Sequence, residues 1–199
     1  MRFMRAGLAA VILLAASNTA GHAQQFGVFG GANFEALVNL QGEGFQTGFK
    51  MSPGFHAGGF VEFARGTFAL RPGLLYQNAG TLFQGFGVLP TENFRLNQLA
   101  LPVDVKWTPP VKYLYVFAGP ELQYNLSNGV PAEFQDVINK ITVRGGAGLG
   151  FQVGRWHLEG RYLLTLTSLT KSDWGVNGTV FTDVEQYSQA IRASLGFGF

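Results

Sequence analysis

Three residues of the types that act together in acyl transfer lie near the C-terminal end of the sequence. His157 and Glu159 are two residues apart, and Ser188 lies in the next segment of alternating polarity. A hydroxyl, an imidazole and a carboxylate within hydrogen-bond reach would supply a nucleophile, a base and a group that orients the base. Their sequence positions alone fix no such contact. We therefore favour a histidine paired with a carboxylate inside the protein, and no catalytic site.

The sequence offers still fewer residues that could bind a metal or act as a thiol. The chain has no Cys, and beyond residue 23 its only histidines are His56 and His157. Apart from Glu159, neither has a His or carboxylate at ligand spacing on its own segment. The glycine run at 145–150 lacks the Lys-Ser/Thr ending of a phosphate loop. We expect no enzyme, no metal site and no cofactor.

The first residues have the composition of an export signal. Arg2 and Arg5 precede an apolar run at 6–16, and small residues end at Ala23. A run of about 11 residues fits a leader and falls short of the ~20 that a spanning helix needs. The predicted domains are a signal peptide at 1–23, cleaved after Ala23, and an exported domain at 24–199.

Removing this leader changes the charge of the chain. Its two arginines belong to the 14 basic residues, so 12 basic residues remain against 12 acidic ones. The mature protein is formally neutral, and the whole-chain pI of about 9.0 does not indicate a nucleic-acid partner.

Beyond the leader, apolar residues recur at every second position, as in Leu101, Val103 and Val105. This period predicts strands with one apolar face. The predicted strands are 26–34, 55–63, 68–76, 99–107, 114–122, 141–153, 158–166 and 187–199. Their apolar face carries no charge, and no stretch of 18 apolar residues predicts a transmembrane helix.

The opposite face of these strands carries charges thinned by small residues. They are Glu62, Arg71, Asp104, Lys106, Glu121, Arg144, Glu159, Arg161 and Arg192. Five cations against four anions, most of the cations being arginine, fit a narrow interior of paired charges better than a surface in water. The apolar face is therefore predicted to contact lipid. Gln98, on the charged face near a predicted strand end, is expected to tolerate arginine.

The lengths of the connections alternate along the chain. Short ones at 64–66, 108–112 and 154–155 separate long ones at 35–52, 80–94, 127–139 and 167–185. Outer-membrane barrels have short periplasmic turns and long extracellular loops. The predicted fold is all-β, an eight-stranded antiparallel up-and-down transmembrane β-barrel. A soluble lipocalin-like barrel is the alternative, and it requires the apolar face to point inward.

Aromatic residues occupy both ends of the predicted strands. Trp107, Tyr113 and Trp156, with Phe63 and Phe68, flank the short turns, whereas Tyr76, Tyr124 and Tyr162 are among those near the long loops. Such rings favour the two membrane interfaces.

Three prolines complicate this prediction. Pro72, Pro102 and Pro120 fall inside strands, and proline cannot donate to a ladder. We expect a β-bulge at each of them. In the loop at 127–139, Pro131 and the apolar residues after it predict one or two helical turns.

The end of the sequence resembles the assembly signal of bacterial outer-membrane barrels, with Ile191, Leu195, Phe197 and Phe199 on one face. The segments 27–34, 71–76, 101–103 and 118–120 are similar to small porin-family outer-membrane β-barrel domains, including PorT-like and OmpA-like proteins. The resemblance implies a Gram-negative bacterium, an outer-membrane location, lipid as surroundings and the barrel-assembly machinery as a partner during biogenesis.

Given such a barrel, we expect a monomer with a salt-bridged interior that serves envelope structure or binds an unknown ligand or protein through four long loops. A narrow porin-like channel and a component that assists protein translocation or secretion are the alternatives. An enzyme that modifies lipids is the least favoured one.

Overall fold

The structure, a computed structural model, describes residues 23–39, 52–83, 92–126, 139–167, 174–176, 179–181 and 186–199. Ten strands lie in these ranges. They are β1 (Ala23–Asn39), β2 (Ser52–Arg65), β3 (Phe68–Phe83), β4 (Glu92–Trp107), β5 (Leu114–Leu126), β6 (Ile141–Val153), β7 (Trp156–Thr165), β8 (Trp174–Val176), β9 (Thr179–Phe181) and β10 (Gln186–Gly198). No helix in these ranges is long and apolar enough to cross a membrane.

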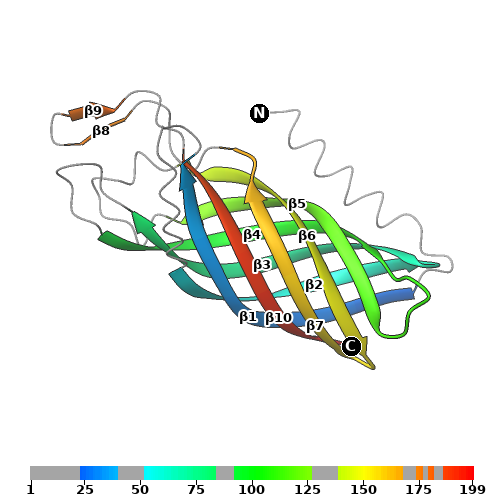
Figure 1. The fold of residues 1–199 in the computed structure, drawn as a ribbon. Coiled ribbons are helices and arrows are strands. Elements are labelled where there is room, and N and C mark those ends of the chain that lie inside the picture. The colour runs from blue at the N-terminus through cyan, green and yellow to red at the C-terminus, as the bar shows by residue number, and fades with distance from the viewer. Residues whose placement is uncertain are drawn as a thin grey trace.

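Eight of the strands form a closed antiparallel barrel in the order β1-β10-β7-β6-β5-β4-β3-β2 (Figure 1). The first and last strands close it with a continuous register from Gly27 opposite Gly198 to Asn39 opposite Gln186. The predicted fold class is confirmed.

The stagger of the strands sets the width of the barrel. A path through successive paired residues leaves β1 at Ala23 and returns to it at Asn33, ten residues further along. Ten residues correspond to about 33 Å along a strand, and eight strands side by side measure about 38 Å perpendicular to the strands. Their ratio gives a tilt of about 40°, within the range of eight-stranded membrane barrels, whose interior side chains can fill.

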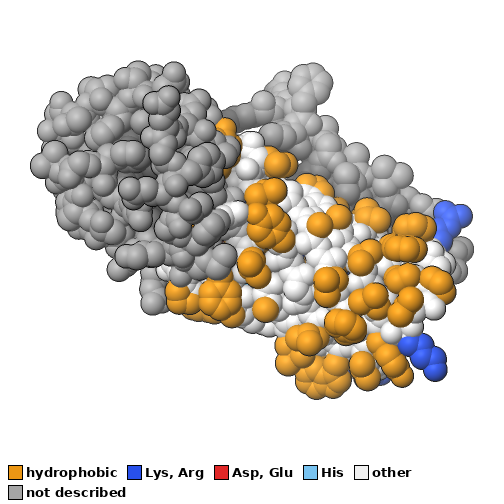
Figure 2. Space-filling view, viewed as in Figure 1, with side chains coloured by type: hydrophobic (Ala, Val, Ile, Leu, Met, Phe, Trp, Pro, Cys, Tyr) orange, Lys and Arg blue, Asp and Glu red, His pale blue; other side chains and the backbone are white. Residues whose placement is uncertain are grey.

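The strands alternate as predicted, with the apolar face outward. Phe26, Leu74 and Val105 are more than half exposed, whereas the intervening positions are mostly buried or partly buried. Figure 2 shows hydrophobic side chains over the visible barrel wall, with Lys and Arg side chains only at one end. An apolar exterior around a polar interior excludes the lipocalin-like alternative.

Several strands are longer than predicted. β1 continues to Asn39, β3 continues to Phe83, and β4 begins at Glu92, so two of the predicted long loops are shorter. The loop after β7 contains a hairpin of β8 and β9 that the sequence did not suggest. In Figure 1 this hairpin lies beyond the barrel end opposite the C-terminus. The predicted helical turns at 131–138 lie outside the described residues, as does the predicted leader apart from Ala23.

The three short turns lie at the C-terminal end of the barrel, called the turn end below. Gly66 and Gly154 adopt φ values of 64° and 61° in the two tightest turns, which glycine allows without a Cβ clash. Tyr113 adopts a φ of 69° in the longer turn between β4 and β5.

The predicted bulges at the three prolines are wrong. The register between β3 and β4 is the same on both sides of Pro72 and Pro102, and the register between β5 and β6 continues through Pro120. Instead, pairing skips two residues at a time without a change of register, at 61–62 opposite 71–72, at 73–74 opposite 101–102 and at 103–104 opposite 119–120. An inserted residue would turn every following side chain to the other face, and here both faces are strongly specified.

The lipid face gives a direct test of the fold. Val103 lies mid-way along the membrane part of β4 between the exposed Leu101 and Val105. Val103→Arg is expected to lower the free energy of unfolding from lipid by about 2–4 kcal/mol, because it places a cation near the bilayer midplane. Urea titration of barrels folded in vesicles measures this loss.

The matched control lies at the end of the same strand. Thr108 is exposed directly after Trp107, so Thr108→Arg is expected to cost at most about 1 kcal/mol. Equal losses for the two variants would contradict the face assignment. Gln98 is unsuitable as a tolerant position, contrary to expectation, because it is fully buried and hydrogen-bonded.

Candidate functional site

The interior of the barrel, called the lumen below, holds the main concentration of polar groups among the described residues. All nine charged residues expected there are buried or nearly so, and Glu35 of β1 joins them with 2% exposure. Sequence interpretation missed Glu35 because it ended the first strand at Phe34. With it, five cations face five anions. The charges in the lumen therefore sum to zero.

Ion pairs connect these ten residues. The pairs are Arg71–Asp104, Arg71–Glu159, Lys106–Glu62, Arg144–Glu35, Arg161–Asp104 and Arg192–Glu121. Only Arg71 and Asp104 lie on neighbouring strands. The other five pairs join strands that are not neighbours. Lys106–Glu62 reaches from β4 past β3 to β2, whereas the remaining four pairs cross the lumen, and Arg71 of β3 reaches Glu159 on the opposite wall. The pairs therefore brace the barrel from within.

Arg71 occupies the middle of the lumen. Its guanidinium carbon lies 5.3 Å from the ring centroid of Phe60 and 4.9 Å from that of Phe117. Both of its terminal nitrogens hydrogen-bond the Glu159 carboxylate, which also accepts a 2.6 Å bond from the Tyr115 hydroxyl. A guanidinium held between two rings and a bidentate carboxylate has little freedom to move aside.

Towards the long loops, the lumen contains a hydrogen-bonded chain of amides. Arg192 donates to both oxygens of Glu121, at 2.7 and 3.1 Å, and also to Gln77. Gln77 donates to Gln98, which donates at 2.6 Å to Asn125. The chain spans β10, β3, β4 and β5 and closes this level of the lumen.

Towards the turn end, Lys106 closes the lumen. Its ammonium donates to both oxygens of Glu62 at 3.1 Å and to Gln152 at 3.0 Å, and it lies 4.3 Å from the ring centroid of Tyr115. Charge pairs therefore lie at the turn end, in the middle and near the loops.

Large apolar side chains also point inward, which the sequence pattern did not indicate. Phe60, Leu75, Phe117 and Leu163 are at most 6% exposed. The glycines of β6 make room for the rings, because Tyr115 pairs with Gly150 and Phe117 pairs with Gly148. A Cβ at Gly150 would lie 2.3 Å from Tyr115 Cζ. This agrees with the interpretation of the glycine run as a thinned strand.

Gly150→Ala tests this packing. The added methyl group must displace the Tyr115 ring and its hydrogen bond to Glu159, so we expect a loss of about 1–3 kcal/mol in the free energy of unfolding. Gly160→Ala is the matched control, since its Cβ would meet no atom within 4 Å. Urea unfolding of the two variants gives the comparison, and equal stabilities would contradict the packing.

A cavity of about 30 Å³ remains beside Arg71. Asp104, Arg161 and Arg192 are among its lining residues, and the Asp104 Oδ1, Arg161 Nε and Arg192 Nε atoms have no protein partner. This volume suits a bound water or two, which these atoms would hold. It is far below the several hundred Å³ of a ligand pocket.

The candidate catalytic residues do not meet. Ser188 hydrogen-bonds Arg144 and Thr165 towards the loops, whereas His157 pairs with Gly196, eight residues away along β10. That offset is roughly 26 Å along a strand. Among the described residues, no group of three or more His, Asp or Glu side chains could hold a metal ion.

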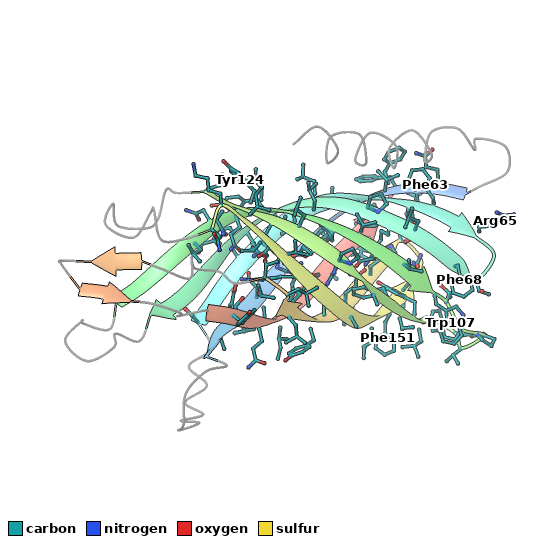
Figure 3. All side chains as sticks on the ribbon, turned by 90° about the horizontal axis from the view of Figure 1, so that it is seen from above. Phe63, Arg65, Phe68, Trp107, Tyr124 and Phe151 are labelled. Carbon is teal, nitrogen blue, oxygen red and sulfur yellow. The ribbon has the colours of Figure 1, made fainter. Side chains whose placement is uncertain are left out.

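The aromatic and assembly residues lie on the outer wall. Trp107, Tyr113 and Trp156 are between 42% and 58% exposed at the turn end. Figure 3 shows Phe63, Phe68 and Trp107 towards this end, with Tyr124 towards the other. Of the proposed assembly residues, Ile191, Leu195 and Phe199 are exposed, and Phe197 packs against Trp156 at 5.1 Å between ring centroids.

Most of the sequence matches a known family. Residues 15–171 match the family described as the outer membrane protein beta-barrel domain. The chain belongs to this family. It is an outer-membrane β-barrel protein, and its apolar exterior is the surface that faces lipid.

Solved structures similar to this outer-membrane barrel share little of its sequence. Ail, the attachment invasion locus protein of Yersinia pestis, solved with the heparin analogue sucrose octasulfate, is 11% identical with a TM-score of 0.47, covering 88% of this chain and 99% of Ail. The outer membrane protein OprG from Pseudomonas aeruginosa is 9% identical with a TM-score of 0.47, covering 89% and 97%. No curated protein matches the chain.

Proposed function

We propose that this outer-membrane barrel is a non-conducting structure that spans the membrane and presents its long loops at the cell surface, for envelope integrity or for contact with other molecules. The observation that carries the proposal is the set of four ion pairs that cross the lumen, together with the Lys106–Glu62 pair at the turn end. A pore for solutes needs a continuous aqueous path, and these pairs lie across it at successive levels.

The energetics of the pairs favour a closed lumen. Opening a path past Arg71 means parting its guanidinium from Glu159, Phe60 and Phe117 together. Separating a buried pair leaves two uncompensated charges in a region that holds room for about one or two waters. The neutral total charge of the lumen also offers no preference for an ion of either sign.

The proposal assigns the outer-membrane barrel no catalytic role. Ser188, His157 and Glu159 do not form one site, because Glu159 binds Arg71 and Tyr115 while Ser188 lies far along β10. We further propose that the protein is a monomer surrounded by outer-membrane lipid, since the exposed apolar residues are spread over all eight barrel strands.

Planar-bilayer recording tests the proposal. Purified protein is expected to give no large, steady conductance, although recovered protein shows the heat-modifiable gel migration of a folded barrel. Bilayers without protein are the baseline. Large, steady conductance steps from folded protein would overturn the closed lumen and favour the narrow channel.

A further inference from the structure

Each of the three short turns carries one exposed cation beside an exposed aromatic ring. Arg65 is opposite Phe68 across the first turn, Lys112 precedes Tyr113 in the second, and Arg155 precedes Trp156 in the third. We call these three cations the basic rim. We propose that the basic rim binds the phosphates of anionic phospholipid headgroups in the periplasmic leaflet of the outer membrane.

The cations of the basic rim are free to bind. Arg65, Lys112 and Arg155 are exposed, and no ion pair among the described residues includes them. The turns at 66–67, 108–113 and 154–155 contain no acidic side chain. Glu62, the nearest acidic residue to Arg65 in sequence, is 7% exposed and already paired with Lys106 inside the lumen. The side chains of the turns therefore present positive charge alone.

The neighbouring rings place the basic rim at headgroup depth. Phe68, Tyr113 and Trp156 are each 55–58% exposed and continue the apolar outer wall to its edge. Aromatic rings at such an edge occupy the membrane interface, and a cation one step beyond them meets the phosphates. Figure 3 places Arg65 past Phe63 and Phe68, and Figure 2 shows Lys and Arg side chains at this end beyond the hydrophobic surface.

The spacing favours several lipids rather than one compact anion. Successive turns are two strand positions apart around the barrel, at least roughly 10 Å, and the first and third turns are four positions apart, on opposite sides of the barrel. Because the first and third turns lie on opposite sides of the barrel, the three cations cannot converge on one phosphate, and the basic rim must meet more than one headgroup. A peptidoglycan or acidic-protein partner would contact the turns from the periplasm and would not need the ring beside each cation.

Tryptophan quenching by brominated lipid measures this binding at the rim itself. Trp156 adjoins Arg155, and Trp107 is opposite Phe68, which in turn is opposite Arg65. In a Trp174→Phe background, these two residues are the only tryptophans of the mature chain. The protein is folded into vesicles that mix brominated phosphatidylglycerol with phosphatidylcholine, and into matched vesicles with the bromine on phosphatidylcholine.

The Trp174→Phe protein, the parent of the variants below, is expected to prefer phosphatidylglycerol over phosphatidylcholine about fivefold at each cation. This preference is expected to shrink in concentrated salt. The triple variant Arg65→Gln, Lys112→Gln, Arg155→Gln is expected to lose it. Lys140→Gln, which removes an exposed cation at the loop end before β6, is expected to keep it. If the triple variant does not fold, Arg155→Gln carries the test in a background that also contains Trp107→Phe, which leaves Trp156 as the reporter.

The proposal is overturned if parent and triple variant select phosphatidylglycerol equally, or if Lys140→Gln loses as much selectivity as the triple variant. It is also overturned if lipid selectivity is absent while binding to isolated peptidoglycan depends on the three cations. These outcomes are independent of whether the lumen conducts, so failure here and failure of the closed-lumen proposal are separate results.

Discussion

Replacing Arg192 by methionine is expected to lower the free energy of unfolding by about 3–5 kcal/mol. Arg192 is 3% exposed, and both oxygens of the fully buried Glu121 accept hydrogen bonds from it. Methionine fills much of the volume but leaves the carboxylate without its cation. Gln77 loses its donor as well, which loosens the amide chain that continues through Gln98. Urea unfolding of barrels folded in vesicles, followed by tryptophan fluorescence, measures the loss.

The double variant Arg192→Met, Glu121→Gln separates the missing charge partner from a general packing defect. It removes the uncompensated charge while leaving a side chain of similar size, so it is expected to recover a large part of the lost stability. Lys140→Met, which removes an exposed cation, is expected to change stability by less than about 0.5 kcal/mol. A double variant no more stable than Arg192→Met, or a single variant as stable as the parent, contradicts a stabilising pair at this position.

The period of two residues is sufficient to predict which charged side chains of the expected strands face the lumen. Arg71, Asp104 and Arg161 fall on the charged face by simple alternation, and the structure buries all three. Their partners were not predictable in the same way. Arg71 meets Glu159, which is 88 residues away in sequence, because the ten-residue stagger brings these levels of β3 and β7 to the same height. Partner choice therefore depends on closure of the whole barrel.

Two expectations from the sequence, the loop position of Glu35 and the bulges at the prolines, are wrong because closure of the barrel overrides local sequence preferences. Glu35 was assigned to a loop because the apolar alternation weakens after Phe34, yet its partner Arg144 and pairing to both β2 and β10 hold it in the strand. The bulges expected at prolines assumed that a missing donor must shift the register. Each proline removes one donor only, and the ladder resumes in the same register because a shift would bury apolar residues and expose Arg71 or Asp104 to lipid.

Deleting Phe199 is expected to leave the exported chain in the periplasm as degraded or aggregated material, with export and leader cleavage unchanged. In the folded barrel Phe199 contributes little, because its side chain is 67% exposed. Its N–H donates a 2.7 Å bond to the Phe26 carbonyl, and its ring meets that of Phe197 at 5.5 Å between centroids. These contacts amount to about 1–2 kcal/mol.

Comparing assembly in cells with folding in vitro distinguishes recognition from stability. If Phe199 acts as an assembly signal, the deletion refolds into detergent or vesicles nearly as well as the parent while its outer-membrane level at low expression falls sharply. Equal outer-membrane levels would contradict the assembly-signal interpretation. A loss of several kcal/mol in vitro would instead place the effect in the folded barrel, through the edge-to-face contacts of Phe199 with Phe197 and of Phe197 with Trp156 at the turn end of the β10–β7 pair.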